Sequence, residues 1–146
     1  MIIGEEEIPN ERALLTQEDG PMMASSASVK YIVIHCSATR STRDYHFYIR
    51  RDGSVTQHRK LLEVGAHCRP WNRCSIGICY EGGLDADGHP ADTRTPEQTE
   101  QFILLLMRMV KIFPGVRIRG HRDMPGSIPK ACPCFDAEGV FGYLEK

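Results

Sequence analysis

Two histidines and a cysteine stand where predicted strands end or in the loop beyond them. His35 follows the apolar run 31–34, and His121 follows the run 116–119 after a single glycine. Cys132 lies in the loop beyond His121. A catalytic zinc ion takes three protein ligands from histidine, cysteine or carboxylate side chains and leaves a fourth position for water. Two strand-end histidines and a loop thiolate would meet that requirement.

The spacing alone leaves other roles open for these side chains. A histidine at a strand end is often a hydrogen-bonded core residue. Cys132 and Cys134 could instead form a thiol pair, although a gap of one residue is poor geometry for a disulfide. The sequence holds six cysteines, and without an export signal their expected state is a reduced thiol or a metal ligand.

Several β-prone segments indicate the sheet that would position these side chains. Residues 31–34 form an uninterrupted apolar run, which is typical of a buried central strand. Segments 45–50 and 54–57 flank Asp52-Gly53, a strong signal for an antiparallel hairpin. Segment 75–80 is a further short apolar strand.

One long helix is predicted after these strands. Thr95 is suited to cap it, Pro96 to begin it, and Gln98 to complete a capping box, while Pro114-Gly115 would end it. Apolar residues then recur at helical spacing along one face. A short strand over 116–119 and a closing helix over 136–144 complete the prediction, which is an α/β fold with a mixed central β-sheet flanked by helices.

The composition limits the kinds of partner that the protein is expected to bind. The chain has 146 residues with 18 Lys+Arg against 19 Asp+Glu, a net charge of −1, which argues against nucleic-acid binding by phosphate neutralisation. The longest apolar run, 102–107, is far too short for a membrane span. Residues 1–29 resemble an acidic leader rather than a signal peptide, so we expect synthesis in the cytoplasm and a single domain over 30–146.

Seven ordered blocks of sequence resemble a known family. They are YIVIHCSAT, YHFYIRRDG, VGAH, SIGICYEGG, TPEQ, GHRD and KACPCFD, and they cover about residues 30–136. Together they resemble the zinc-dependent N-acetylmuramoyl-L-alanine amidases of the T7-type phage lysozyme and peptidoglycan recognition protein superfamily. The resemblance implies an amidase/peptidoglycan-recognition-like fold with one Zn²⁺ ion in a surface groove.

The resemblance also implies roles for individual residues. His35, His121 and Cys132 fall on the three zinc ligands of the family. Tyr45 falls on the tyrosine that orients or deprotonates the attacking water, and Lys130 on the lysine that stabilises the oxyanion.

Two further positions resemble residues of the family's substrate groove. They are His67 in VGAH and Asn72, which follows the tryptophan of the same loop. The implied substrate is peptidoglycan or a muropeptide, bound through hydrogen-bonding and stacking groups.

One departure from the family pattern affects the expected fold. Only the nine residues 36–44 are available between the first histidine and Tyr45, so the helix after the first strand is missing. We expect apolar sheet surface to be left open there, and exposed apolar patches usually have a partner. The leader 1–29 or a second copy of the chain, forming a homo-oligomer, would then cover this surface.

The implied activity is hydrolysis of the amide between N-acetylmuramic acid and the L-alanine of the stem peptide. Such an enzyme, for example a phage or prophage endolysin, would act on the cell wall or on muropeptides in the cytosol. The alternative is a peptidoglycan-binding module without catalysis. Cys132 favours the enzyme, because non-catalytic members of the superfamily commonly lack the third ligand.

Overall fold

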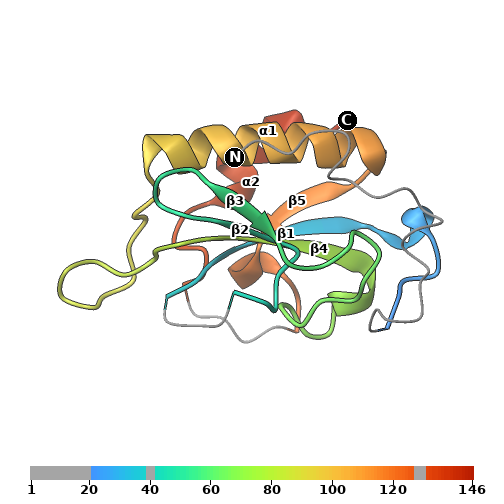
Figure 1. Ribbon diagram of the computed structural model, residues 1–146, viewed down its shortest axis with the longest axis horizontal. Coiled ribbons are helices and arrows are strands. Elements are labelled where there is room, and N and C mark those ends of the chain that lie inside the picture. Colours follow the sequence, from blue (N-terminus) through green and yellow to red (C-terminus); the bar gives the residue numbers. More distant parts are fainter. Residues whose placement is uncertain (1–20, 39–41, 127–130) are drawn as a thin grey trace.

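The fold is organised around a five-stranded mixed sheet (Figure 1). The computed structural model describes residues 21–38, 42–126 and 131–146. The strand order is β3-β2-β4-β1-β5. The strands are β1 (Tyr31–Cys36), β2 (Phe47–Ile49), β3 (Val55–Gln57), β4 (Ser75–Tyr80) and β5 (Arg117–Gly120).

Strand β1 lies near the centre of the sheet between β4 and β5, and it pairs in parallel with both. Parallel neighbours bring their carboxyl ends to one edge of the sheet, and here those ends carry the predicted histidines. Strand β2 is parallel to β4 and antiparallel to β3. The predicted hairpin is confirmed: Gly53 has φ +90, a conformation that glycine adopts without strain, and its N–H donates to the carbonyl of Arg50 at 2.9 Å.

Helix α1 (Pro96–Ile112) covers one face of the sheet (Figure 1). The predicted capping box is present, with the Gln98 backbone N–H donating to the Thr95 hydroxyl at 3.1 Å and the Thr95 backbone N–H donating to the Gln98 side-chain oxygen at 2.9 Å. The predicted closing helix is shorter than expected: α2 (Ala137–Phe141) passes into the 3₁₀ helix η6 (Gly142–Leu144). The rings of Phe102 in α1 and Phe141 in α2 pack with centroids 5.3 Å apart.

The face of the sheet away from α1 carries loops and short 3₁₀ turns. These turns are η4 (Asn72–Cys74) and η5 (His121–Asp123). The connection from β1 to β2 contains no helix in the residues that the structure describes there, 37–38 and 42–46. The fold class is therefore as predicted, including the absence of that helix from the described part of the connection.

The expectation of an open apolar surface on this face is wrong. Val33 and Cys79 have no exposed area, and Tyr48 is buried as well. Val33 packs with Cys68 and Met124, which loops bring over the sheet, while Tyr45 packs with Tyr48 and Cys79. In the part of the chain that the structure describes, loops cover this face, and the expected homo-oligomer stays a prediction.

Part of the predicted leader contacts the domain. The Met23 N–H donates to the Leu62 carbonyl at 2.7 Å, and the side chains of Met23 and Val29 are buried in the main core. Ser26–Ser28 form the 3₁₀ turn η3 between them. The division into a leader 1–29 and a domain 30–146 stays a prediction, because residues 1–20 lie outside the described residues. Within the described part of the chain, no helix has the length and apolar character that crossing a membrane requires.

Candidate metal centre

The parallel pairing of β1 with β5 brings the two predicted histidine ligands together. Ile34 pairs with Gly120, so His35 and His121, the next residue of each segment, stand side by side at the carboxyl edge of the sheet. Their ring centroids are 4.6 Å apart. The His35 side chain is buried, whereas His121 is partly exposed at the start of η5.

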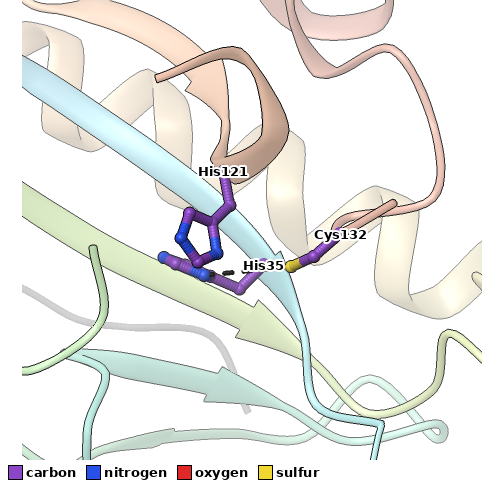
Figure 2. A group of neighbouring side chains, drawn as sticks. All are labelled: His35, His121 and Cys132. Carbon is purple, nitrogen blue, oxygen red and sulfur yellow. Dashed lines mark hydrogen bonds between the residues drawn. The ribbon is translucent and has the colours of Figure 1, made fainter. Parts of the chain in front are cut away.

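Cys132 completes a group of three donor atoms (Figure 2). The ligand atoms of His35, His121 and Cys132 all lie within 4.8 Å of one another. Cys132 Sγ is 3.9 Å from His35 Nδ1. Zinc bonds of the usual lengths in a tetrahedral site place a nitrogen and a sulfur ligand about 3.6 Å apart. The donor types and their separation therefore fit a zinc ion, with one side left for water.

Backbone contacts hold the Cys132 loop against the two strands. The Arg122 N–H donates to the Cys132 carbonyl at 2.8 Å, which ties the loop to η5. The Cys36 N–H donates to Cys132 Sγ at 3.2 Å, which holds the sulfur beside the end of β1. Gly120 permits the close approach, because a Cβ atom there would lie 2.8 Å from Pro133 Cδ.

His67 lies behind His35 rather than in open solvent. It is 6% exposed, and its Nδ1 is 2.9 Å from His35 Nε2. Its Nε2 is 3.3 Å from the Ser75 hydroxyl. Burial away from water holds the pKa of His67 well below the usual value for histidine, and the neighbouring His46 acts in the same direction.

The other predicted site residues surround the same centre. The Tyr45 ring is 4.9 Å, centroid to centroid, from the His35 ring, and the Tyr45 side chain is buried. Asn72 Oδ1 accepts the backbone N–H groups of His67 and Cys68 at 2.9 and 2.8 Å, so it shapes the loop that carries His67. Lys130 lies outside the described residues.

A groove of about 820 Å³ opens over the centre. Its lining includes five of the predicted site residues. This volume lies in the range of known ligand sites. The five residues are Tyr45, His67, Asn72, His121 and Cys132.

Sequence reasoning overlooked Ser75, which is fully buried at the start of β4. Its hydroxyl donates to the Trp71 carbonyl at 2.8 Å and faces His67. A polar first residue in an otherwise apolar strand was the available signal, because a buried hydroxyl requires partners. The partners could not be predicted from the sequence, because Trp71 and His67 lie in the preceding loop, whose path has no periodic pattern.

Comparison with known proteins is consistent with this arrangement. A family model described as N-acetylmuramoyl-L-alanine amidase matches residues 25–135. The endolysin of Klebsiella phage KP32 is 37% identical over 124 residues, covering 72% of this chain and 80% of that protein. The endolysin of Escherichia phage T7 is 34% identical over 128 residues, covering 75% of this chain and 83% of that protein.

Solved structures agree at the level of the fold. The endolysin amidase LysCS from Clostridium intestinale superposes with a TM-score of 0.68 at 22% identity, covering 88% of this chain and 91% of its own. The bumblebee protein PGRP-SA superposes with a TM-score of 0.67 at 19% identity, covering 99% of this chain and 96% of its own. The sheet and the helix on its face are thus shared with both proteins.

Proposed function

The chain belongs to the N-acetylmuramoyl-L-alanine amidase family, and on that premise we propose that it is a zinc-dependent hydrolase of peptidoglycan. The bond cleaved joins the lactyl group of N-acetylmuramic acid to the L-alanine of the stem peptide. The observation that carries the zinc dependence is the convergence of His35, His121 and Cys132, whose donor atoms lie within 4.8 Å of one another.

The three candidate ligands would supply donor atoms of different kinds and charge. The two histidines would supply neutral nitrogen donors and Cys132 a thiolate, a set that leaves one net positive charge on the site. When bound there, zinc supplies a Lewis acid that polarises the scissile carbonyl and activates water near neutral pH. The buried position of His35 and the backbone contacts of Cys132 keep the donors aimed at one point.

Two further side chains complete the proposed reaction. The Tyr45 phenol, beside the His35 ring, would orient the attacking water or accept its proton. The Lys130 ammonium, two residues before a ligand in the sequence, would stabilise the negative charge that develops on the carbonyl oxygen. Both roles come from the family resemblance.

The groove supports a glycan-peptide substrate. It is roomy enough for a muropeptide fragment, and it passes His67 and Asn72, for which the family resemblance implies substrate contacts. Such an enzyme would act on the cell wall or on released muropeptides. A binding module without catalysis is the alternative, and the presence of Cys132 beside both histidines favours the enzyme.

The test compares wild type with Cys132→Ala on purified peptidoglycan, measuring release of L-alanine amino termini together with zinc content. Wild type should bind one zinc per chain and release new termini, and Cys132→Ala should lose both properties. Cys74→Ala is the matched control, because Cys74 is a free, half-buried thiol whose S–H donates to the Trp71 carbonyl at 3.6 Å. Wild type that binds zinc without releasing termini would overturn hydrolysis in favour of the binding module.

A further inference from the structure

A chain of hydrogen bonds runs from the candidate metal centre into the protein interior. His35 Nε2 is 2.9 Å from His67 Nδ1, and His67 Nε2 is 3.3 Å from Ser75 Oγ. Ser75 Oγ in turn donates to the Trp71 carbonyl at 2.8 Å. The side chains of His35, His67 and Ser75 are all buried, so water does not compete for these contacts.

The direction of this chain follows from counting hydrogens. The Ser75 hydroxyl has a single hydrogen, and the Trp71 carbonyl, which can only accept, takes it. The Ser75 oxygen is therefore an acceptor for His67, whose hydrogen lies on Nε2. In a neutral imidazole the other nitrogen, Nδ1, then accepts, and the His35 hydrogen lies on Nε2.

This arrangement determines whether the other nitrogen of His35, Nδ1, carries a hydrogen. With its hydrogen on Nε2, neutral His35 carries a lone pair on Nδ1, and this is the nitrogen that faces Cys132 Sγ at 3.9 Å. This row of buried hydrogen bonds thus selects the one tautomer of His35 that can bind a metal in the candidate centre. It also fixes the plane of the ring.

The surroundings of His67 keep its ring in this orientation. A Cβ atom at Gly77 would lie 2.7 Å from His67 Cγ, so β4 leaves room for the ring only because residue 77 is glycine. The loop backbone is held as well, since the His67 N–H donates to Asn72 Oδ1 at 2.9 Å. With both ring nitrogens engaged inside the protein, His67 has none left to bond a substrate without breaking this chain.

We propose that His67 is a positioning residue for the metal centre, which fixes the tautomer and the ring plane of His35 from behind. This role rests on the proposed function, because the ion that His35 would bind is the proposed zinc. It assigns His67 to the support of a ligand in place of the substrate contact that the family resemblance implied. Partners of this kind typically change metal affinity by 10–100-fold when removed.

The experiment uses two substitutions at one position. His67→Leu removes the acceptor that faces His35, whereas His67→Asn has nearly the same shape as leucine and can place an amide oxygen close to the position of Nδ1. His46→Asn is the control, because His46 is a buried neighbouring histidine whose ring centroid lies 5.8 Å from that of His67. Its Nδ1 accepts from the Gly77 N–H, and its Nε2 donates to the Glu63 carbonyl. Zinc affinity of each folded full-length protein is measured by competition with a chelating dye.

A second readout needs no metal. Nitrogen-15 NMR of the imidazole rings in the zinc-free protein reports which nitrogen of His35 carries the hydrogen. Wild type and His67→Asn should show the Nε2–H form of His35, and His67→Leu should show a mixture of tautomers. Catalytic activity does not enter this measurement.

The outcomes separate the positioning role from the proposed function. The role predicts a 10–100-fold loss of zinc affinity in His67→Leu, a loss of less than about threefold in His67→Asn, and no loss in His46→Asn. Equal affinity in wild type and His67→Leu would overturn it, as would equal losses in the leucine and asparagine variants, which would indicate packing alone. A wild type that binds no zinc would instead overturn the proposed function.

Discussion

Tyr45 is the side chain next to the metal centre whose proposed role depends on a single hydroxyl. Its ring packs against His35 with centroids 4.9 Å apart, and the residue is 4% exposed. Tyr45→Phe keeps the ring and removes the group proposed to handle the proton of the attacking water. We expect zinc content to be unchanged and kcat for release of L-alanine termini to fall about 10²-fold or more.

Tyr48→Phe is the matched control for that measurement. Tyr48 is buried in the same small cluster as Tyr45 and Cys79, so the two variants lose the same atom from neighbouring places. The control should keep kcat within a few-fold of wild type. Equal losses in both variants, or none in Tyr45→Phe, would show that the Tyr45 hydroxyl takes no part in the chemistry.

His46 gives the folded chain a dependence on pH that is separate from the chemistry. Burial lowers the pKa of His46 to about 4 from an ordinary value of 6.5. The unfolded chain therefore binds the proton more readily, and stability falls as the pH drops from about 6.5 to about 4. A shift of this size corresponds to about 3 kcal/mol across that window.

Chemical denaturation of the zinc-free protein at several pH values tests this expectation. His46→Asn should be less stable at pH 7, since its contacts to Gly77 and Glu63 change, but its stability should depend less steeply on pH. Burial, the main cause of the lowered pKa of His67, is present in both proteins, so most of the difference between the two curves comes from His46. Parallel curves for the two proteins would contradict the assignment.

The positions of the two candidate histidine ligands could be predicted from the sequence, because each follows from a local pattern. His35 and His121 each follow a β-prone run, and parallel strands bring such positions together. The place of His67 could not be predicted in the same way. Its contact with His35 spans 32 residues and depends on the path of a loop with no regular periodicity.

Among the elements, helix α1 depends on one buried polar side chain at its first turn. Gln98 has no exposed area, and its amide donates to the carbonyls of Ile49 and Glu81 at 3.1 and 3.0 Å. It also closes the capping box with Thr95. Gln98→Leu removes these bonds and leaves buried carbonyl capacity unmet, so we expect a loss of about 2 kcal/mol in the free energy of unfolding.

Denaturant titration followed by far-ultraviolet circular dichroism measures that loss. Gln101→Leu is the control, because Gln101 lies on the same helix with its side chain partly exposed. It should change stability by no more than about 0.5 kcal/mol. Similar values for the two variants would mean that the hydrogen bonds from α1 to the ends of β2 and β4 contribute little to the free energy of unfolding.

Elements with strong local signals were predicted closely, and the loops were not. Helix α1 begins at Pro96 as the capping box indicates, and the hairpin turns at Asp52-Gly53. The covering of the second sheet face was missed because it comes from loop residues such as Cys68 and Met124, which carry no periodic pattern. Long-range packing of this kind is not encoded in any short window of sequence.

In the whole molecule, the candidate metal centre joins segments that are far apart along the chain. His35 lies near the end of β1, His121 follows the edge strand β5, and Cys132 belongs to the loop that leads into α2 (Figure 2). An ion held by all three would cross-link these segments in the folded state. The unfolded chain has no such preformed site, so metal binding adds to the free energy of folding.

Zinc should therefore raise the thermal stability of the whole domain. At a free zinc concentration 100 times the dissociation constant, the gain is about 2.7 kcal/mol, or roughly 10 °C in Tm for a chain of this size. Cys132→Ala should show little or none of this gain, while Cys74→Ala should show all of it. Scanning calorimetry with and without zinc makes the comparison, and a wild-type Tm that does not respond would mean that the folded chain holds zinc no more tightly than the unfolded one.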